Sequence, residues 1–229
     1  MAKLLAIETS SESCSVALSL DGESMEVHEH APMRHAELLL PAVSRLLGEA
    51  GLPIAALDAI AFGRGPGSFT SLRIGIGVVQ GLAWAADLPV VPCSSLAAVA
   101  QAAIDLTGAG SGRVCVAVDA RMQEVFTAEF VCGPGGLAEA ASAERVCAPS
   151  VLAHEATTPF VAAGNGFERF AELKDMAETA VACYPDLWPH AAVVARLALA
   201  WLEHHQPLPP ALAQPVYIRN NVAVKPASD

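Results

Sequence analysis

Two segments of this chain share one pattern, and that pattern strongly restricts the possible fold. Both "KLLAIETSSESCSVALSL" (3–20) and "RVCVAVDARMQEVFTAEF" (113–130) begin with an apolar strand that leads to a single acid, Glu8 or Asp119. A second apolar strand follows each acid after six residues, at Cys14 and at Val125. Each half then continues with alternating helices and strands, which is the order of a ribonuclease-H-like fold present twice. The sequence therefore predicts an α/β protein of two ribonuclease-H-like subdomains.

The periodicity of apolar residues places the elements of the first half. It predicts strands at 3–9, 14–20, 23–30 and 57–63, and helices at 34–50 and 70–86. The glycine-rich stretch "TGAGSG" at 107–112 is typical of a linker. We therefore expect an N-terminal subdomain over 1–106 and a C-terminal subdomain over 107–229.

Composition and charge narrow the class of protein. The chain of 229 residues is 53% hydrophobic and has a formal net charge of −11, so stand-alone binding to a nucleic-acid backbone is not expected. The six cysteines include no C-x-x-C pair and no signal peptide is apparent, which favours reduced thiols in the cytoplasm. The longest uncharged run, 88–104, contains two prolines and three polar residues, so no membrane span is predicted.

The stretch "FGRGPGSFTSLRIG" (62–75) has the composition of a phosphate-binding loop, because glycines and a helix N-terminus can surround an anion. Its spacing fits no known phosphate fingerprint. A P-loop requires a lysine that is absent here, and Thr70 stands where a dinucleotide-binding loop has its third glycine. The alternative, a structural turn, is the favoured interpretation.

Several motifs together resemble one family. "LLAIETSSESCSVAL", "RHAELLLPAV", "GRGPGSFTSLRIG", "VDARMQEVF" and "PVYIR" occur in the order typical of the TsaB (YeaZ) family, in the actin, Hsp70 and sugar-kinase superfamily. The resemblance implies a subunit of the bacterial machinery that forms threonylcarbamoyladenosine next to the tRNA anticodon. It further implies a heterodimer with a catalytic TsaD-like paralogue, a TsaE-like ATPase as third component, a homodimer when alone, and contact with tRNA only through the complex.

The residues that carry chemistry in the paralogue are absent here. TsaD-like proteins hold their metal with a His-x-x-x-His pair, and we place Ser95 and Val99 at those two positions. Valine has no lone pair and serine is a poor ligand for transition metals. TsaD-like proteins have paired carboxylates after the first strand, and this chain has only Glu8 and Glu12 there. Their adenosine-binding glycine loop is represented here only by "GNG" at 164–166. We therefore expect no catalytic, cofactor-binding or metal-binding residues, and a subunit that is not itself an enzyme.

Two enzymatic alternatives have little support. A glycoprotease-like peptidase would need an activated nucleophile, but the chain lacks a G-x-S-x-G elbow, and Ser68 or Ser71 is better explained as a helix N-cap. An ATP-dependent small-molecule kinase would need the phosphate loop that the spacing excludes.

The His28-x-His30 pair places two imidazoles on one face of a predicted strand, where they could hold a metal. The sequence offers no obvious third ligand nearby. An exposed strand face is therefore the favoured interpretation of this pair.

The helices predicted at 34–50 and 70–86 are the candidates for a protein interface. The first has a wider apolar arc than a surface helix needs, and the second repeats small residues every four positions, which permits close approach of another backbone. The alternative is that both are core helices of the α/β layer. The family resemblance favours a partner interface, because TsaB-like proteins use these helices to pair. The predicted interface residues are His35, Leu39, Leu46, Leu72, Gly77 and Gly81.

Overall fold

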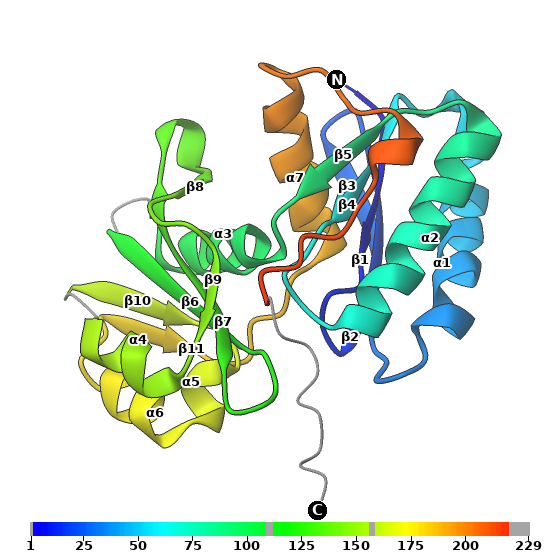
Figure 1. Cartoon of the computed structure of the whole chain (residues 1–229). Helices are drawn as coiled ribbons and strands as arrows, with labels where there is room; N and C mark the ends of the chain where they lie inside the picture. Colours follow the sequence, from blue (N-terminus) through cyan, green and yellow to red (C-terminus); the bar gives the residue numbers. More distant parts are fainter. Residues whose placement is uncertain (1, 109–111, 156–158, 220–229) are drawn as a thin grey trace, which may run out of the picture.

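The computed structural model describes residues 2–108, 112–155 and 159–219 and contains two separate β-sheets (Figure 1). The first sheet has the strand order β3-β2-β1-β4-β5, and the second has the order β11-β10-β6-β7-β8, with β9 also paired to β7. In the first sheet β1 is antiparallel to β2 and parallel to β4; in the second, β6 is antiparallel to β7 and parallel to β10. The two sheets therefore repeat one topology, which confirms the predicted pair of ribonuclease-H-like subdomains.

The first half of the chain supplies eight of the principal elements. They are β1 (Leu4–Glu8), β2 (Ser13–Leu20), β3 (Glu23–His30), α1 (His35–Ala50), β4 (Ala59–Gly63), α2 (Phe69–Ala86), β5 (Val90–Cys93) and α3 (Ser95–Thr107). A short 3-10 helix, Ile54–Ala56, connects α1 to β4. These bounds confirm the elements that periodicity predicts.

The second half supplies the remaining strands and helices. They are β6 (Arg113–Asp119), β7 (Val125–Cys132), β8 (Ala138–Ala140), β9 (Arg145–Cys147), α4 (Pro149–Glu155), β10 (Phe160–Ala163), α5 (Gly166–Arg169), α6 (Ala171–Ala177), β11 (Ala182–Tyr184) and α7 (Ala191–Leu202). Two further 3-10 helices lie at Pro134–Gly136 and Pro210–Leu212. The short elements α4 and β11 have too few residues for a periodic signal, and the sequence analysis does not predict them.

Strand β1 shows how the first core is built. Its side chains alternate between two faces, and all of them are buried. Leu5 and Ile7 pack with the apolar residues of α1 and α2, while Leu4 and Ala6 pack with those of α7. The first sheet is therefore covered by helices on both sides, as expected for strands without an exposed face.

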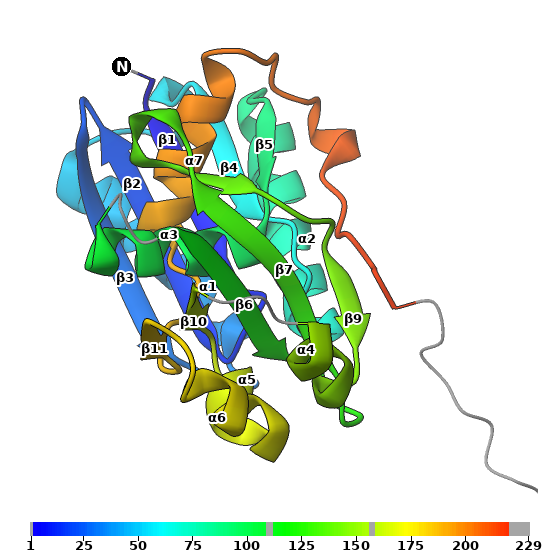
Figure 2. The same cartoon turned by 90° about the vertical axis from the view of Figure 1, so that its left-hand side faces the viewer.

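Two helices pack on the sheet that the other half of the chain supplies. Helix α7 follows the second sheet in sequence but packs against the first (Figures 1 and 2), whereas Val99 and Ala103 of α3 pack with strands of the second. All strands before residue 106 belong to one sheet and all strands after it to the other. The division into 1–106 and 107–229 stays a prediction about folding units. Residues 109–111 of the predicted linker lie outside the described residues.

One helix among the described residues, α2, is long and apolar enough to cross a membrane, with a mean hydropathy of 1.2. In the structure it packs on β4 and beside α1 and contributes Ile76, Val79 and Ala83 to the core. Core helices of soluble proteins pass the same test of length and composition, so the helix is weak evidence for a span. The expectation of no membrane span stays a prediction.

Candidate protein-interaction surface

The acid that ends β1 lies in a closed, fully packed position. Glu8 is fully buried; its Oε1 accepts a hydrogen bond of 2.6 Å from the backbone amide of Ser10, and its Oε2 accepts one of 2.7 Å from Ser95 Oγ. Burial raises the pKa of Glu8, although these hydrogen bonds lower it in part. A Cβ at Gly63 would come within 1.9 Å of Glu8 Oε2, so the carboxylate fills the space beside β4.

These residues do not fit the metal of a TsaD-like protein. Val99 is buried in the second core, and Ser95 uses its hydroxyl to hold Glu8. Both oxygens of the Glu8 carboxylate are already engaged, and the aliphatic side chain of Val99 supplies no ligand atom.

The glycine-rich loop after β4 packs tightly against the chain that follows β1. Ser68 donates its backbone amide to the carbonyl of Ser10 at 2.8 Å, and a Cβ at Gly67 would lie 2.3 Å from that same carbonyl oxygen. A Cβ at Gly75 would lie 2.1 Å from Thr9 Oγ1. Close backbone approach explains these two glycines, in agreement with the structural-turn interpretation. Ser68 does occupy the N-cap position of α2, but its side chain caps no backbone amide.

A cavity of about 1010 Å³ lies between the loops of the two halves. Three arginines line it, and each contacts another part of the same chain. Arg121 pairs with Glu12 at 2.7 Å and Arg219 pairs with Glu124, while the Arg73 guanidinium lies 3.9 Å from the centroid of the Phe69 ring. In this conformation Arg121 and Glu124 serve contacts within the fold.

Four of the six predicted interface residues are buried within the monomer. His35, Leu39, Leu46 and Leu72 are each at most 1% exposed. Leu39 and Leu46 belong to the first hydrophobic core, and His35 Nε2 lies 3.2 Å from the carbonyl oxygen of Ser13. The apolar stripe of α1 therefore faces the sheet, because a helix must first cover the sheet on which it packs. A side chain buried in the monomer is not available to a partner.

The outward side of α1 and α2 carries a different set of residues. The two helices lie side by side along one edge of the molecule (Figure 1). Leu40 is 51% exposed, Phe69 45% and Trp84 73%, and an added Cβ at Gly77 or Gly81 would meet no atom within 4 Å. We name these five residues the helix-pair face. The predicted roles of Gly77 and Gly81 at an interface stay predictions, and the sequence analysis does not identify the three large side chains.

The helix-pair face has the composition of an interaction surface. Large aromatic and aliphatic side chains beside glycines allow both burial of apolar area and close approach of a partner backbone. The ion pairs Arg34–Glu37 at 3.2 Å and Arg45–Glu49 at 2.8 Å lie on the exposed side of α1 or just before it. An apolar centre with polar residues at its margin is typical of protein interfaces.

Comparison with known proteins identifies the family. The family model described as "TsaD: tRNA N6-adenosine threonylcarbamoyltransferase" matches residues 27–223. The Escherichia coli tRNA threonylcarbamoyladenosine biosynthesis protein TsaB is 36% identical over 97% of both chains. The chain belongs to the TsaB family. It is therefore a TsaB-type protein of tRNA threonylcarbamoyladenosine biosynthesis, within the wider family that the TsaD model describes.

Two further relatives agree with membership of the TsaB family. The Haemophilus influenzae protein TsaB is 50% identical over a segment that spans 56% of this chain and 53% of that protein. The solved structure "YeaZ from Pseudomonas aeruginosa" superposes with a TM-score of 0.83 at 41% identity, and covers 95% of this chain and 100% of that one. The match therefore extends over both β-sheets of this chain.

Proposed function

We propose that this TsaB-type protein is a non-catalytic subunit for the formation of threonylcarbamoyladenosine at the tRNA adenosine next to the anticodon. It acts by dimerising with a catalytic TsaD-like paralogue, together with a TsaE-like ATPase. The observation that carries the proposal is the helix-pair face. Trp84, 73% exposed on a helix whose opposite side is buried, is the largest apolar side chain on this surface.

The closed position around Glu8 supports a role without catalysis. Both carboxylate oxygens are engaged within the chain, and Ser95 and Val99 supply no metal ligands there. A subunit that stabilises its partner needs a docking surface rather than reactive groups. The helix-pair face offers such a docking surface. Among the described residues, no reactive groups lie at the position where the TsaD-like paralogue carries them.

The helix-pair face accounts for two assemblies. An isologous interface places the same patch of two identical chains in contact, and a paralogue with the same fold can take the place of one of them. We therefore propose a homodimer in isolation and a heterodimer with the TsaD-like chain, which compete for the helix-pair face. The net charge of −11 disfavours direct binding to tRNA, so tRNA contact belongs to the assembled complex, in the cytoplasm.

Reconstitution tests this proposal directly. The TsaD-like and TsaE-like proteins of the same organism are incubated with unmodified tRNA and a threonylcarbamoyl donor, with and without this chain. Mass spectrometry of the digested tRNA measures the modified nucleoside. We expect formation only when all three proteins are present, co-elution of this chain with the TsaD-like protein, and no modification by this chain alone. Full activity without this chain, or activity of this chain alone, contradicts the proposal.

A further inference from the structure

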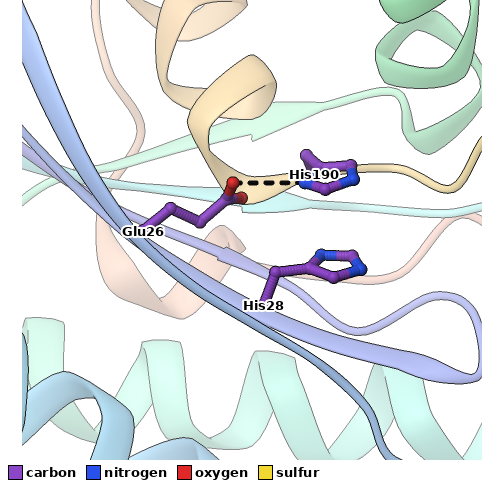
Figure 3. A group of neighbouring side chains, drawn as sticks. All are labelled: Glu26, His28 and His190. Atoms are coloured by element: carbon purple, nitrogen blue, oxygen red, sulfur yellow. Dashed lines mark hydrogen bonds and ion pairs between the residues drawn. The ribbon is translucent and has the colours of Figure 1, made fainter.

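Three side chains from two distant parts of the sequence meet beside the N-terminus of α7 (Figure 3). Glu26 and His28 project from the same side of β3, because residues two apart on a strand share a face. His190 immediately precedes α7, 164 positions after Glu26. One potential ligand atom from each residue lies within 4.8 Å of the other two.

The carboxylate of Glu26 is held in place by hydrogen bonds. Its Oε1 accepts from Ser15 Oγ at 2.6 Å and from the backbone amide of Ala192 at 3.1 Å, and its Oε2 lies 3.1 Å from His190 Nδ1. Burial by itself would raise the pKa of Glu26, but these hydrogen bonds and the charge of His190 lower it to about 2. The carboxylate of Glu26 is therefore fixed next to the imidazole of His190.

His28 is the member that hydrogen bonding does not explain. Its ring stacks on that of His190, with centroids 3.9 Å apart and planes inclined by 11°. Its Nδ1 is buried and has no hydrogen-bond partner among the described residues. A buried polar atom without a partner costs free energy. Burial, and then the charge of His190, lower the pKa of His28.

We propose that Glu26, His28 and His190 form a binding site for a divalent transition-metal ion such as Zn²⁺. Two imidazoles and one carboxylate are a ligand set that zinc accepts, with water in the fourth position of the tetrahedron. A hydrogen bond between Glu26 and His190 alone explains the position of those two residues, but it leaves His28 Nδ1 without a partner. A metal ion gives all three residues one common role.

Binding requires one ring to turn. A ligated metal lies close to the plane of each imidazole, and two parallel rings stacked as in Figure 3 do not share one point in both planes. The side chain of His190 is 37% exposed, so we take it as the ring that turns. The ion then links β3 of the first sheet to the segment that returns from the second sheet to α7. The proposed site differs from the expectation of no metal-binding residues. His190 is far from His28 in sequence, so the sequence did not indicate it as a third ligand.

Metal titration of the full chain tests the site. Tag-free protein is stripped with a chelator, and Zn²⁺ binding is measured by isothermal titration calorimetry. We expect one ion per chain, and an affinity at least roughly tenfold weaker in His28→Gln and in His190→Gln. The control is His154→Gln, an exposed histidine at the end of α4, which leaves the affinity unchanged.

Cobalt distinguishes this site from the cysteines, since all six thiols are free and Cys183 is exposed. Co²⁺ bound by Glu26, His28 and His190 gives no thiolate-to-metal charge-transfer band. His28→Gln decides the outcome if His190→Gln fails to fold, because His28 lies on a strand face that is only partly buried. Absence of saturable Zn²⁺ binding, equal affinity in His28→Gln, or a thiolate band with Co²⁺ overturns the proposal.

Discussion

Ser95 Oγ donates a hydrogen bond of 2.7 Å to Glu8 Oε2, and both side chains are buried. The residues come from β1 and from the first turn of α3, 87 positions apart. The hydroxyl of Ser95 is directed at a carboxylate of its own chain. The contact gives Ser95 a structural role within its own chain.

Glu8→Gln is expected to stabilise the protein at neutral pH. Burial raises the pKa of Glu8 above its usual value of 4.5, so the folded state binds this proton more tightly than the unfolded state. The folded state therefore loses stability relative to the unfolded chain as the pH rises above 4.5. Glutamine keeps the acceptor for the amide of Ser10 and carries no charge. Urea unfolding at about pH 8 should show the variant as the more stable protein, and the difference should shrink towards about pH 5. A difference that is the same at both pH values contradicts the raised pKa.

Gly63→Ala is expected to destabilise the fold. The new Cβ would lie 1.9 Å from Glu8 Oε2, and that carboxylate has no free space because both of its oxygens are hydrogen-bonded. Overpacking of this kind costs about 1–3 kcal/mol in the free energy of unfolding. Gly48→Ala is the matched control, since an added Cβ there meets no atom within 4 Å and alanine favours a helix by up to about 1 kcal/mol. Equal unfolding free energies of the two variants would refute the assignment of Gly63 to close packing.

Two neighbouring leucines separate the core side of α1 from its outward side. Leu39 is fully buried, so Leu39→Ala should lower the free energy of unfolding by about 2–5 kcal/mol. Leu40 is 51% exposed, so Leu40→Asp should change stability by only about 0.5 kcal/mol but weaken association roughly tenfold or more. Denaturant unfolding measures the first effect, and sedimentation with and without the TsaD-like protein measures the second. Val151→Asp, an exposed position on α4, serves as the control for an added charge. Unchanged association of Leu40→Asp argues against this part of the helix-pair face.

Gly81→Phe is expected to block association while the monomer still folds. Open space surrounds the position of the added Cβ, so the phenyl ring can point outward without a clash inside the chain. At an interface the same ring prevents the close approach that glycine permits. Circular dichroism reports folding, and gel filtration with the TsaD-like chain reports association. Val181→Phe adds the same ring at a site 67% exposed in the second subdomain and should leave association intact. A Gly81→Phe protein that still forms the heterodimer and supports tRNA modification excludes this role for Gly81.

The sequence by itself determined the fold class. The strands around Glu8 and Asp119 repeat one local pattern, and local patterns of this kind follow from the period of two in a strand and of 3.6 in a helix. The ranges predicted for 34–50 and 70–86 differ from α1 and α2 by one residue at their starts. Motifs spread over the whole chain were sufficient to identify the TsaB family.

Tertiary structure decided which side chains remain available to other molecules. A wide apolar arc on α1 does not show which part of it faces the sheet, so Leu39 was predicted at an interface and is in the core. The exchange of α3 and α7 between the sheets depends on packing between segments far apart in sequence. The same long-range packing brings His190 beside His28, on a strand face where the sequence alone offered two histidines and no third ligand. Periodicity shows only which side of a helix or strand is apolar. The neighbours that this side contacts depend on the whole fold.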